Sequence, residues 1–438
     1  MAQPTIAPTA SSTLTTALRR RVGPAPALFA DGSAISRHEL WQRVDRRRRE
    51  LALADRSLVA LTGSNSVEFV VTYLALLDGG HVPLLAASTA HVERLVRHWE
   101  PTAVVSIDDD AVRIDRRRTD SPWLHPDLAL LLGTSGSTGS PKLVRLSHAN
   151  LLANATSIAS YLELDDADVG ITSLPLHYCY GLSVLHSHLL VGAGLVVTDD
   201  SVVDPCFARA MDRHGVTNLA GVPHTFEMLE RAGAERIDVP SLRLITQAGG
   251  RLDPDDVGRW LDRATEWGAD FVVMYGQTEA TARMAYLPPE LARDHPGAIG
   301  IPIPGGHLRL APVDCAAGLD DIGELVYTGP NVMMGYARDL DDLARGSELD
   351  ELRTGDLARF DGIAAVSQHE QAGKGADAQG PDDGRPAAAP GADRVGHEGE
   401  ADGQRYHAIE LASAHERESH DGRAERHDGH ARAQRQRE

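Results

Sequence analysis

Cysteine is scarce in this sequence, and long apolar runs are absent. The three cysteines, Cys179, Cys206 and Cys315, stand far apart, which fits neither a disulfide framework nor a zinc-binding pattern. We expect free thiols in a reducing compartment. No segment reaches about 18 uninterrupted apolar residues, the length that a membrane-spanning helix needs, and the N-terminus lacks the apolar core of a signal peptide. These absences predict a soluble, cytoplasmic protein without a membrane span.

Basic charge is also in deficit. The 438 residues carry a formal net charge of -20, which argues against a nucleic-acid partner bound through phosphate contacts. Lysine occurs only twice, as Lys142 and Lys374, although arginine is abundant. Lys142 ends a loop rich in Gly and Ser, so we favour a functional reason for its presence over chance.

From about residue 21, short apolar runs alternate with helical patterns. The runs 57–63 and 128–134 are typical of buried strands, and Ser147 can cap the helix that follows the second run. This alternation predicts βαβ crossovers and mostly parallel sheets with helices on both faces. We therefore expect an α/β fold with a large core domain over 21–296, preceded by a flexible N-terminus over 1–20.

The character of the chain changes twice after this core. Short strands punctuated by Gly and Pro, without long helices between them, predict a smaller β-rich subdomain over 297–362. Residues 363–438 are mostly Ala, Gly, Asp, Arg, His, Glu and Gln. Such a segment buries too little apolar surface to offset its ordering entropy. We expect 363–438 to be a low-complexity, disordered tail.

The loop GTSGSTGSPK (133–142) directly follows an apolar strand pattern. Its glycines allow consecutive backbone N–H groups to converge on an anion, while its hydroxyls add donors and Lys142 adds charge. Gly139 is followed by Ser and Pro rather than by Lys, so the loop is not the Walker signature and a hydrolase of that type is disfavoured. The residues that we expect to cradle phosphates are Thr134, Ser135, Gly136, Ser137, Thr138, Gly139 and Lys142.

This loop and three later motifs resemble those of the adenylate-forming superfamily, which includes acyl-CoA synthetases, peptide-synthetase adenylation domains and luciferases. The later motifs are YGQTEAT (275–281), GELVYTGPNVMMGY (323–336) and RTGDLA (353–358), in the order of that family. The resemblance covers roughly 25–362. It implies activation of a carboxylic acid by ATP to acyl-AMP, with release of pyrophosphate and then transfer to a thiol. ATP and Mg²⁺ are the implied cofactors, and CoA or the phosphopantetheine of an acyl carrier protein is the implied acceptor.

Several residues of these motifs are candidates for the site. Glu279 follows a strand end, where α/β sheets place ligands, and a carboxylate there can hold Mg²⁺; a solvated loop Glu is the alternative. The resemblance implies that Glu279 binds the metal, that Thr278 contacts the phosphates and that Asp356 binds the ribose. It also implies that Tyr275 stacks on adenine, although it could be a core aromatic. The further residues that we expect around the nucleotide are Gly249, Gly250, Gly276 and Gln277.

The segment LPLHYCYGLS (174–183) resembles the part of the family that lines the acyl pocket. Peptide-synthetase adenylation domains usually carry an Asp near here for the substrate's α-ammonium group, and this segment has none. A fatty, aryl or other simple acyl acid is therefore favoured over an α-amino acid. His177 is a catalytic candidate that either gates the pocket or packs, and GVPHTFEML (221–229) is expected to form another wall.

The resemblance further implies a C-terminal domain that supplies an Arg and a catalytic Lys. After Gly362 the sequence does not continue the family's pattern, and Lys374 stands in QAGKGADAQ, outside the context of that Lys. We hypothesise a truncated or frameshifted enzyme of impaired activity. The alternative is a non-catalytic ATP or acyl-adenylate binding protein, or a partial enzyme that needs the C-terminal domain in trans.

Overall fold

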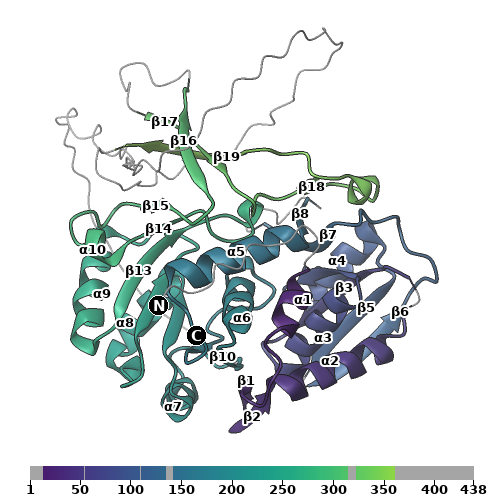
Figure 1. Cartoon of the computed structure of the whole chain (residues 1–438), viewed down its shortest axis with the longest axis horizontal. Coiled ribbons are helices and arrows are strands. Elements are labelled where there is room, and N and C mark those ends of the chain that lie inside the picture. Colours follow the sequence, from purple (N-terminus) through teal and green to yellow (C-terminus); the bar gives the residue numbers. More distant parts are fainter. Residues whose placement is uncertain (1–12, 54, 109, 135–141, 314–321, 361–438) are drawn as a thin grey trace, which may run out of the picture.

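The computed structural model describes residues 13–53, 55–108, 110–134, 142–313 and 322–360. Two large sheets stand side by side with helices packed between them, and a small antiparallel sheet lies across one end (Figure 1). The tail predicted for 363–438 lies outside the described residues. The expected α/β fold, with large sheets rich in parallel strands and a smaller β-rich part, is confirmed.

The larger sheet has the strand order β15-β14-β13-β12-β11-β9-β10-β1-β2. From β13 to β1 the neighbouring strands are parallel, and the edge strands β14, β15 and β2 are antiparallel to their neighbours. Its strands are β1 (Pro26–Ala30), β2 (Ser33–Ser36), β9 (Val169–Ile171), β10 (Gly194–Val196), β11 (Asn218–Gly221), β12 (Leu244–Gln247), β13 (Asp270–Tyr275), β14 (Ala285–Leu287) and β15 (Ile301–Pro302).

The second sheet has the order β18-β8-β7-β4-β3-β5-β6. Its central strands β7, β4, β3 and β5 are parallel, and both ends of the sheet are antiparallel. The strands are β3 (Leu58–Gly63), β4 (Val82–Ala86), β5 (Ala103–Asp108), β6 (Ala111–Arg116), β7 (Leu128–Gly133), β8 (Leu143–Ser147) and β18 (Gly335–Ala337). The runs predicted as strands at 57–63 and 128–134 thus form β3 and β7.

Helices α5 and α6 lie between the two sheets, and α7, α8 and α9 cover the outer face of the larger sheet (Figure 1). Ser147 caps α5 as predicted, in a reciprocal pair of hydrogen bonds with Asn150. The helices are α1 (Leu14–Arg19), α2 (Arg37–Leu51), α3 (Val67–Asp78), α4 (Thr89–Trp99), α5 (His148–Tyr161), α6 (Cys179–Val191), α7 (Pro205–His214), α8 (Pro223–Ala232), α9 (Pro254–Trp267) and α10 (Pro289–Ala292).

The expectation of a flexible N-terminus is wrong for the last residues of the segment 1–20. Thr13 caps α1 by accepting a hydrogen bond from the backbone N–H of Thr16. Leu14 is fully buried in the main core, and Arg19 forms ion pairs with acidic side chains of α2 and α3. Burial of the apolar face outweighs the low intrinsic stability of so short a helix.

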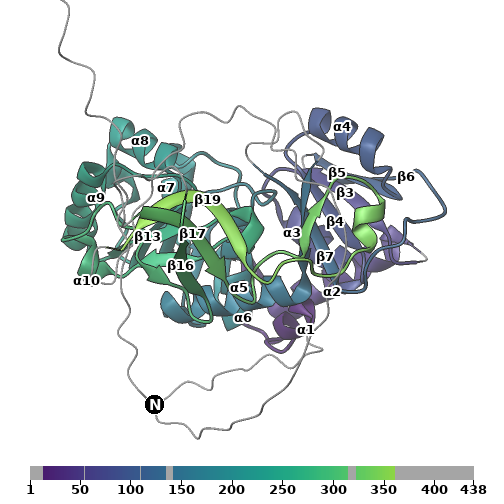
Figure 2. The ribbon, with the colours of Figure 1, turned by 90° about the horizontal axis from the view of Figure 1, so that it is seen from above.

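The small sheet consists of β16 (His307–Ala311), β17 (Ile322–Thr328) and β19 (Leu352–Arg359), all antiparallel. Viewed from above, it lies over α5 and β13 (Figure 2). The predicted β-rich segment 297–362 is not self-contained, because β15 joins the larger sheet and β18 pairs with β8. These pairings join parts of the segment to β14, which follows the motif 275–281, and to β8, which follows the loop 133–142.

Candidate functional site

The carboxyl end of β13 is joined to β19 by hydrogen bonds between two predicted motifs. The Tyr275 hydroxyl donates to Asp356 Oδ2 over 2.6 Å, and Gln277 Nε2 donates to the same oxygen over 3.1 Å. Gln277 also donates to the Thr354 carbonyl. These bonds fix the orientation of the half-buried Asp356 carboxylate, the predicted ribose acceptor. The Tyr275 ring is buried in the main core, so the structure gives its hydroxyl a positioning role, and adenine stacking stays a prediction.

A second group connects the end of the phosphate loop with the predicted metal ligand. Lys142 Nζ lies 3.4 Å from the centre of the Tyr336 ring, and the Tyr336 hydroxyl donates to Glu279 Oε1 over 2.8 Å. Burial raises the pKa of Tyr336, and the Glu279 carboxylate raises it further. The phenol therefore stays protonated and remains a donor. Lys142, Tyr336 and Glu279 come from three separate segments and meet at one point.

Arg145 holds the strand that carries Tyr336. The guanidinium is fully buried and donates to the Tyr336 carbonyl, while the Arg145 backbone pairs with Gly335 across β8 and β18. It also pairs with the Glu348 carboxylate. Sequence reasoning assigned no role to Arg145 or Tyr336. The signal available was an arginine within the apolar strand LVRLS (143–147), where a charge needs buried partners.

Thr278 and His177 lie in different surroundings. Thr278 is buried, and its hydroxyl donates to Cys179 Sγ over 3.5 Å. Burial raises the pKa of the Cys179 thiol, which keeps it protonated. Burial lowers the pKa of the half-buried His177, and nearby His91 lowers it further, so a neutral imidazole is favoured. A catalytic role for His177 stays a prediction.

The Gly249–Gly250 turn at the end of β12 lies against the two segments expected to line the acyl pocket. Gly249 has φ +80°, and a side chain there would meet Val222 at 3.0 Å and the Tyr178 hydroxyl at 3.1 Å. The Gly250 carbonyl accepts from Gln247 Nε2 over 2.8 Å. The turn thus needs glycine for both its backbone conformation and its close contacts.

The remaining predicted residues fall near these groups or outside the described chain. A Cβ at Gly276 would lie 1.8 Å from the Ala282 carbonyl oxygen, so the chain after β13 can turn this tightly only with glycine. Thr134 follows the last residue of β7. The predicted phosphate-binding residues that lie outside the described chain are Ser135, Gly136, Ser137, Thr138 and Gly139.

The donor set at Glu279 suits magnesium rather than a metal bound by many side chains. Among the described residues, no group of three or more His, Cys, Asp or Glu side chains could hold a metal ion. Mg²⁺ is usually bound by one or two carboxylates together with phosphate oxygens and water. The single carboxylate of Glu279, beside Lys142, fits that requirement. No helix within the described ranges is long and apolar enough to span a membrane.

Known proteins share the sequence pattern of this chain. A family model described as AMP-binding enzyme matches residues 15–337. A feruloyl-CoA synthase from Amycolatopsis is 29% identical over 374 residues, which cover 78% of this chain and 75% of that protein. A 2-succinylbenzoate–CoA ligase from Bacillus cereus is 26% identical over 321 residues, which cover 69% of this chain and 66% of that protein.

Solved structures share its fold. An o-succinylbenzoate coenzyme A synthetase from Bacillus subtilis, in complex with ATP and magnesium ion, has a TM-score of 0.66 at 23% identity, covering 80% of this chain and 78% of the other. VinN in complex with L-aspartate has a TM-score of 0.68 at 23% identity, covering 82% of this chain and 98% of the other. At these identities the likeness concerns the fold alone.

Proposed function

The chain belongs to the AMP-binding enzyme family, and on that premise we propose that it converts a carboxylic acid and ATP into an acyl adenylate and pyrophosphate. The resemblance drawn from the four motifs is thereby confirmed. The chain is an AMP-forming acid–thiol ligase that uses ATP and Mg²⁺ and takes CoA as acyl acceptor. Its particular acid and the roles of single residues are part of the proposal.

The convergence of four motifs at one place carries this proposal. Tyr275 and Gln277 orient Asp356 at one side, and Tyr336 joins Lys142 to Glu279 at the other. The two groups are linked through the chain from 275 to 279, directly after β13. The carboxyl ends of parallel strands are where open α/β sheets bind ligands.

Each residue group has a distinct task in the proposed first half-reaction. Asp356 accepts hydrogen bonds from the ribose hydroxyls, while Lys142 and Thr278 hold the phosphates. Glu279 would hold Mg²⁺, which supplies charge neutralisation at the phosphate oxygens when bound. An oxygen of the acid then attacks the α-phosphorus, and the bond to the bridging oxygen of pyrophosphate breaks. The contribution of these side chains is to position the reactants and to offset negative charge.

In the proposed second half-reaction the thiol attacks the carbonyl carbon and AMP leaves. Burial raises the pKa of Cys179, so its thiol stays protonated against the Thr278 hydroxyl, and the nucleophile of this step is the thiol of the acceptor. The thiol is that of CoA, and the phosphopantetheine of an acyl carrier protein is the alternative acceptor that we propose to test beside it. We place the enzyme in the cytoplasm on the basis of its few, widely spaced cysteines.

The acid is proposed to be a fatty, aryl or other simple acyl acid without an α-amino group. The segment 174–183 has no Asp to pair with an α-ammonium group. The relatives' names include feruloyl, indoleacetate, oxalate and 2-succinylbenzoate, so aromatic acids and acids with two carboxylates are both represented. These names give a starting panel of substrates.

Acid-dependent exchange of labelled pyrophosphate into ATP tests the proposal. We expect exchange above background with one class of carboxylic acid, and a loss of Mg·ATP affinity in Lys142→Ala and Glu279→Ala. Arg231→Ala, at an exposed position of α8, is the matched control. Saturable ATP binding without exchange for any acid favours the alternative, a non-catalytic binding protein. Unchanged affinity in both site variants contradicts the residue assignment.

A further inference from the structure

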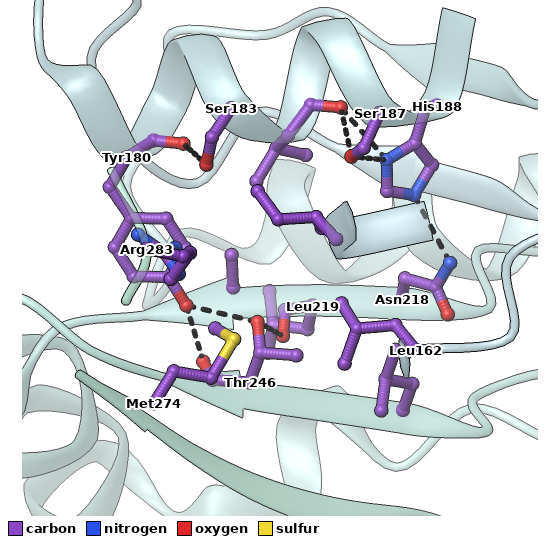
Figure 3. Close-up of a pocket in the computed structure, with 14 residues that line it drawn as sticks. Leu162, Tyr180, Ser183, Ser187, His188, Asn218, Leu219, Thr246, Met274 and Arg283 are labelled. Carbon is purple, nitrogen blue, oxygen red and sulfur yellow. Dashed lines mark hydrogen bonds between the residues drawn. The ribbon is translucent and has the colours of Figure 1, made fainter. Parts of the chain in front are cut away.

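A small internal cavity lies behind the candidate site, between α5 and α6 on one side and β11, β12 and β13 on the other (Figure 3). Its volume is about 20 Å³, which is room for roughly one water molecule. Apolar side chains such as Leu162, Leu219 and Met274 line its middle. Arg283, which lies close to Tyr180 in Figure 3, is its one charged wall residue among those that the structure describes.

Arg283 is a buried cation without a carboxylate partner among the described residues. The residue is 3% exposed, and its Nε atom has no hydrogen-bond partner. One terminal nitrogen donates to the neighbouring Ala282 carbonyl over 3.1 Å. The Tyr180 ring lies 3.7 Å from the guanidinium carbon, and the Tyr161 phenol is also close. All of these neighbours are neutral.

Neutral neighbours offset only part of the cost of burying this charge. A ring face attracts a guanidinium, but a buried cation normally requires an anion with good hydrogen-bond geometry. Two amides fix the backbone of Arg283, because Asn154 Nδ2 and Asn331 Nδ2 both donate to its carbonyl. The guanidinium is therefore held at the cavity by the fold.

The opposite end of the cavity is polar but uncharged. Asn218 Nδ2 donates to His188 Nε2 over 3.1 Å, while Asn218 Oδ1 is buried without a partner. A water molecule in the cavity can donate to Asn218 Oδ1. A water molecule cannot neutralise Arg283, so filling the cavity with solvent leaves its charge unpaired.

The cavity adjoins the proposed reaction centre through α6. Cys179, the first residue of α6, contacts Thr278 through its sulfur, and the next residue, Tyr180, forms the cavity wall. Arg283 follows Thr278 by five positions, after the tight turn at Gly276. The wall formed by Tyr180 and Arg283 is thus close in sequence to Cys179 and Thr278, which touch each other.

We propose that the acid activated by this chain carries a second carboxylate at its far end and that Arg283 pairs with it, after side chains of the cavity wall have moved to enlarge a space that now has room for roughly one water molecule. The inference rests on the proposed acyl-adenylating function and narrows its substrate to the dicarboxylic acids. An arginine suits the binding of a carboxylate because its planar guanidinium group can donate two parallel hydrogen bonds to the two carboxylate oxygens. The flexible Met274 side chain can adjust as the group enters. Arg283 is then a specificity-determining residue, whereas Lys142 and Glu279 serve every acid.

Pyrophosphate exchange with matched pairs of acids tests the inference. The pairs are butanoate and succinate, pentanoate and glutarate, hexanoate and adipate, and benzoate and terephthalate. We expect at least one diacid to exceed its monoacid partner by about tenfold or more in kcat/KM, because a buried cation left unpaired rejects the monoacid. Arg283→Gln should lose that preference mainly by losing the diacid, and Arg283→Lys should retain part of it. Arg231→Gln is the matched control, since it removes an exposed charge.

The outcomes separate this inference from the proposed function. Exchange that favours the monoacid of every pair, or a diacid preference unaltered in a folded Arg283→Gln, overturns the inference and leaves the ligase function standing. If Arg283→Gln does not fold, the test is the ratio of kcat/KM for each diacid over its monoacid partner in the unmodified chain. A ratio of about ten or more for at least one pair supports the inference, and ratios at or below one for every pair overturn it. If no acid supports exchange, thermal shift with each diacid and its monoacid partner decides: a Tm rise specific to a diacid supports the inference, and equal shifts overturn it.

Discussion

Single side chains connect parts of the site that are far apart in the sequence. The Tyr336 hydroxyl donates to Glu279, and its ring lies beside the Lys142 ammonium group. Tyr275 and Gln277 act in the same way on Asp356. In each case an uncharged group holds a charged one, so the charged groups are oriented before substrates arrive. Such preorganisation reduces the cost of positioning during the reaction.

Replacing Tyr336 by Phe keeps the ring near Lys142 and removes the donor to Glu279. We expect the affinity for Mg·ATP to fall by about tenfold to a hundredfold, since one hydrogen bond to a charged group contributes roughly 1.5–3 kcal/mol. Titration of Mg·ATP against the variant measures this. Tyr286→Phe, at a partly buried ring stacked on Tyr161, serves as the control. Equal affinity of Tyr336→Phe and the unmodified chain contradicts the assigned role.

The sequence names the motif residues as candidates, whereas the contacts that hold their side chains are visible only in the fold. Glu279 and Asp356 stand in short motifs whose order along the chain resembles a known family. Arg145 and Tyr336 contact partners that are distant in the sequence, and only the fold shows those partners. An arginine inside an apolar segment is the one local signal for Arg145, and it names no partner.

At the scale of elements, the burial of both faces explains why the strands β3 and β7 could be predicted from the sequence. The runs 57–63 and 128–134 form β3 and β7 because both faces of these strands are covered, so that nearly every residue is apolar. Helix α1 was missed because a six-residue helix has no recognisable period of its own. The pairing of β18 with β8 joins residues almost two hundred positions apart, and no local pattern encodes it.

Helix α6 makes the stability of the fold sensitive to acid. His186 on α6 is 3% exposed. Its Nε2 atom and the Tyr73 hydroxyl of α3 form a hydrogen bond of 3.0 Å. Burial lowers the pKa of His186 to about 3, against about 6.5 in an unfolded chain. The unfolded state therefore takes up a proton below pH 6.5 that the folded state does not. The contribution of His186 is intact above that pH and is lost as the pH falls toward 3.

We accordingly expect His186→Gln to flatten the pH dependence of the free energy of unfolding. The slope contributed by one such histidine approaches about 1.4 kcal/mol per pH unit. Urea unfolding at several values between about pH 5 and 6.5 measures the slope. His224→Gln, at an exposed position of α8, should leave it unchanged. Equal slopes for His186→Gln and the unmodified chain would contradict the assigned contribution of His186 to the pH dependence.

At the scale of the whole molecule, the two large sheets and the small sheet all contribute residues to the candidate site. β13 of the larger sheet leads to Thr278 and Glu279. In the second sheet, Lys142 directly precedes β8 and Tyr336 is the middle residue of β18, and β19 of the small sheet carries Asp356. No single sheet holds all of these groups. The relative placement of the sheets, fixed by α5 and α6 between them (Figure 1), therefore sets the geometry in which an acid and ATP would meet.

Transfer of a labelled oxygen tests most directly whether the chain adenylates a carboxylic acid. The chain is supplied with Mg·ATP, CoA and the most active acid, which is labelled with oxygen-18 in its carboxylate. The mass of the AMP formed is then measured by mass spectrometry. Attack of the carboxylate on the α-phosphorus, followed by thiol attack on the carbonyl carbon, predicts AMP that carries one labelled oxygen. Unlabelled AMP, or label found in ADP or inorganic phosphate, contradicts the account.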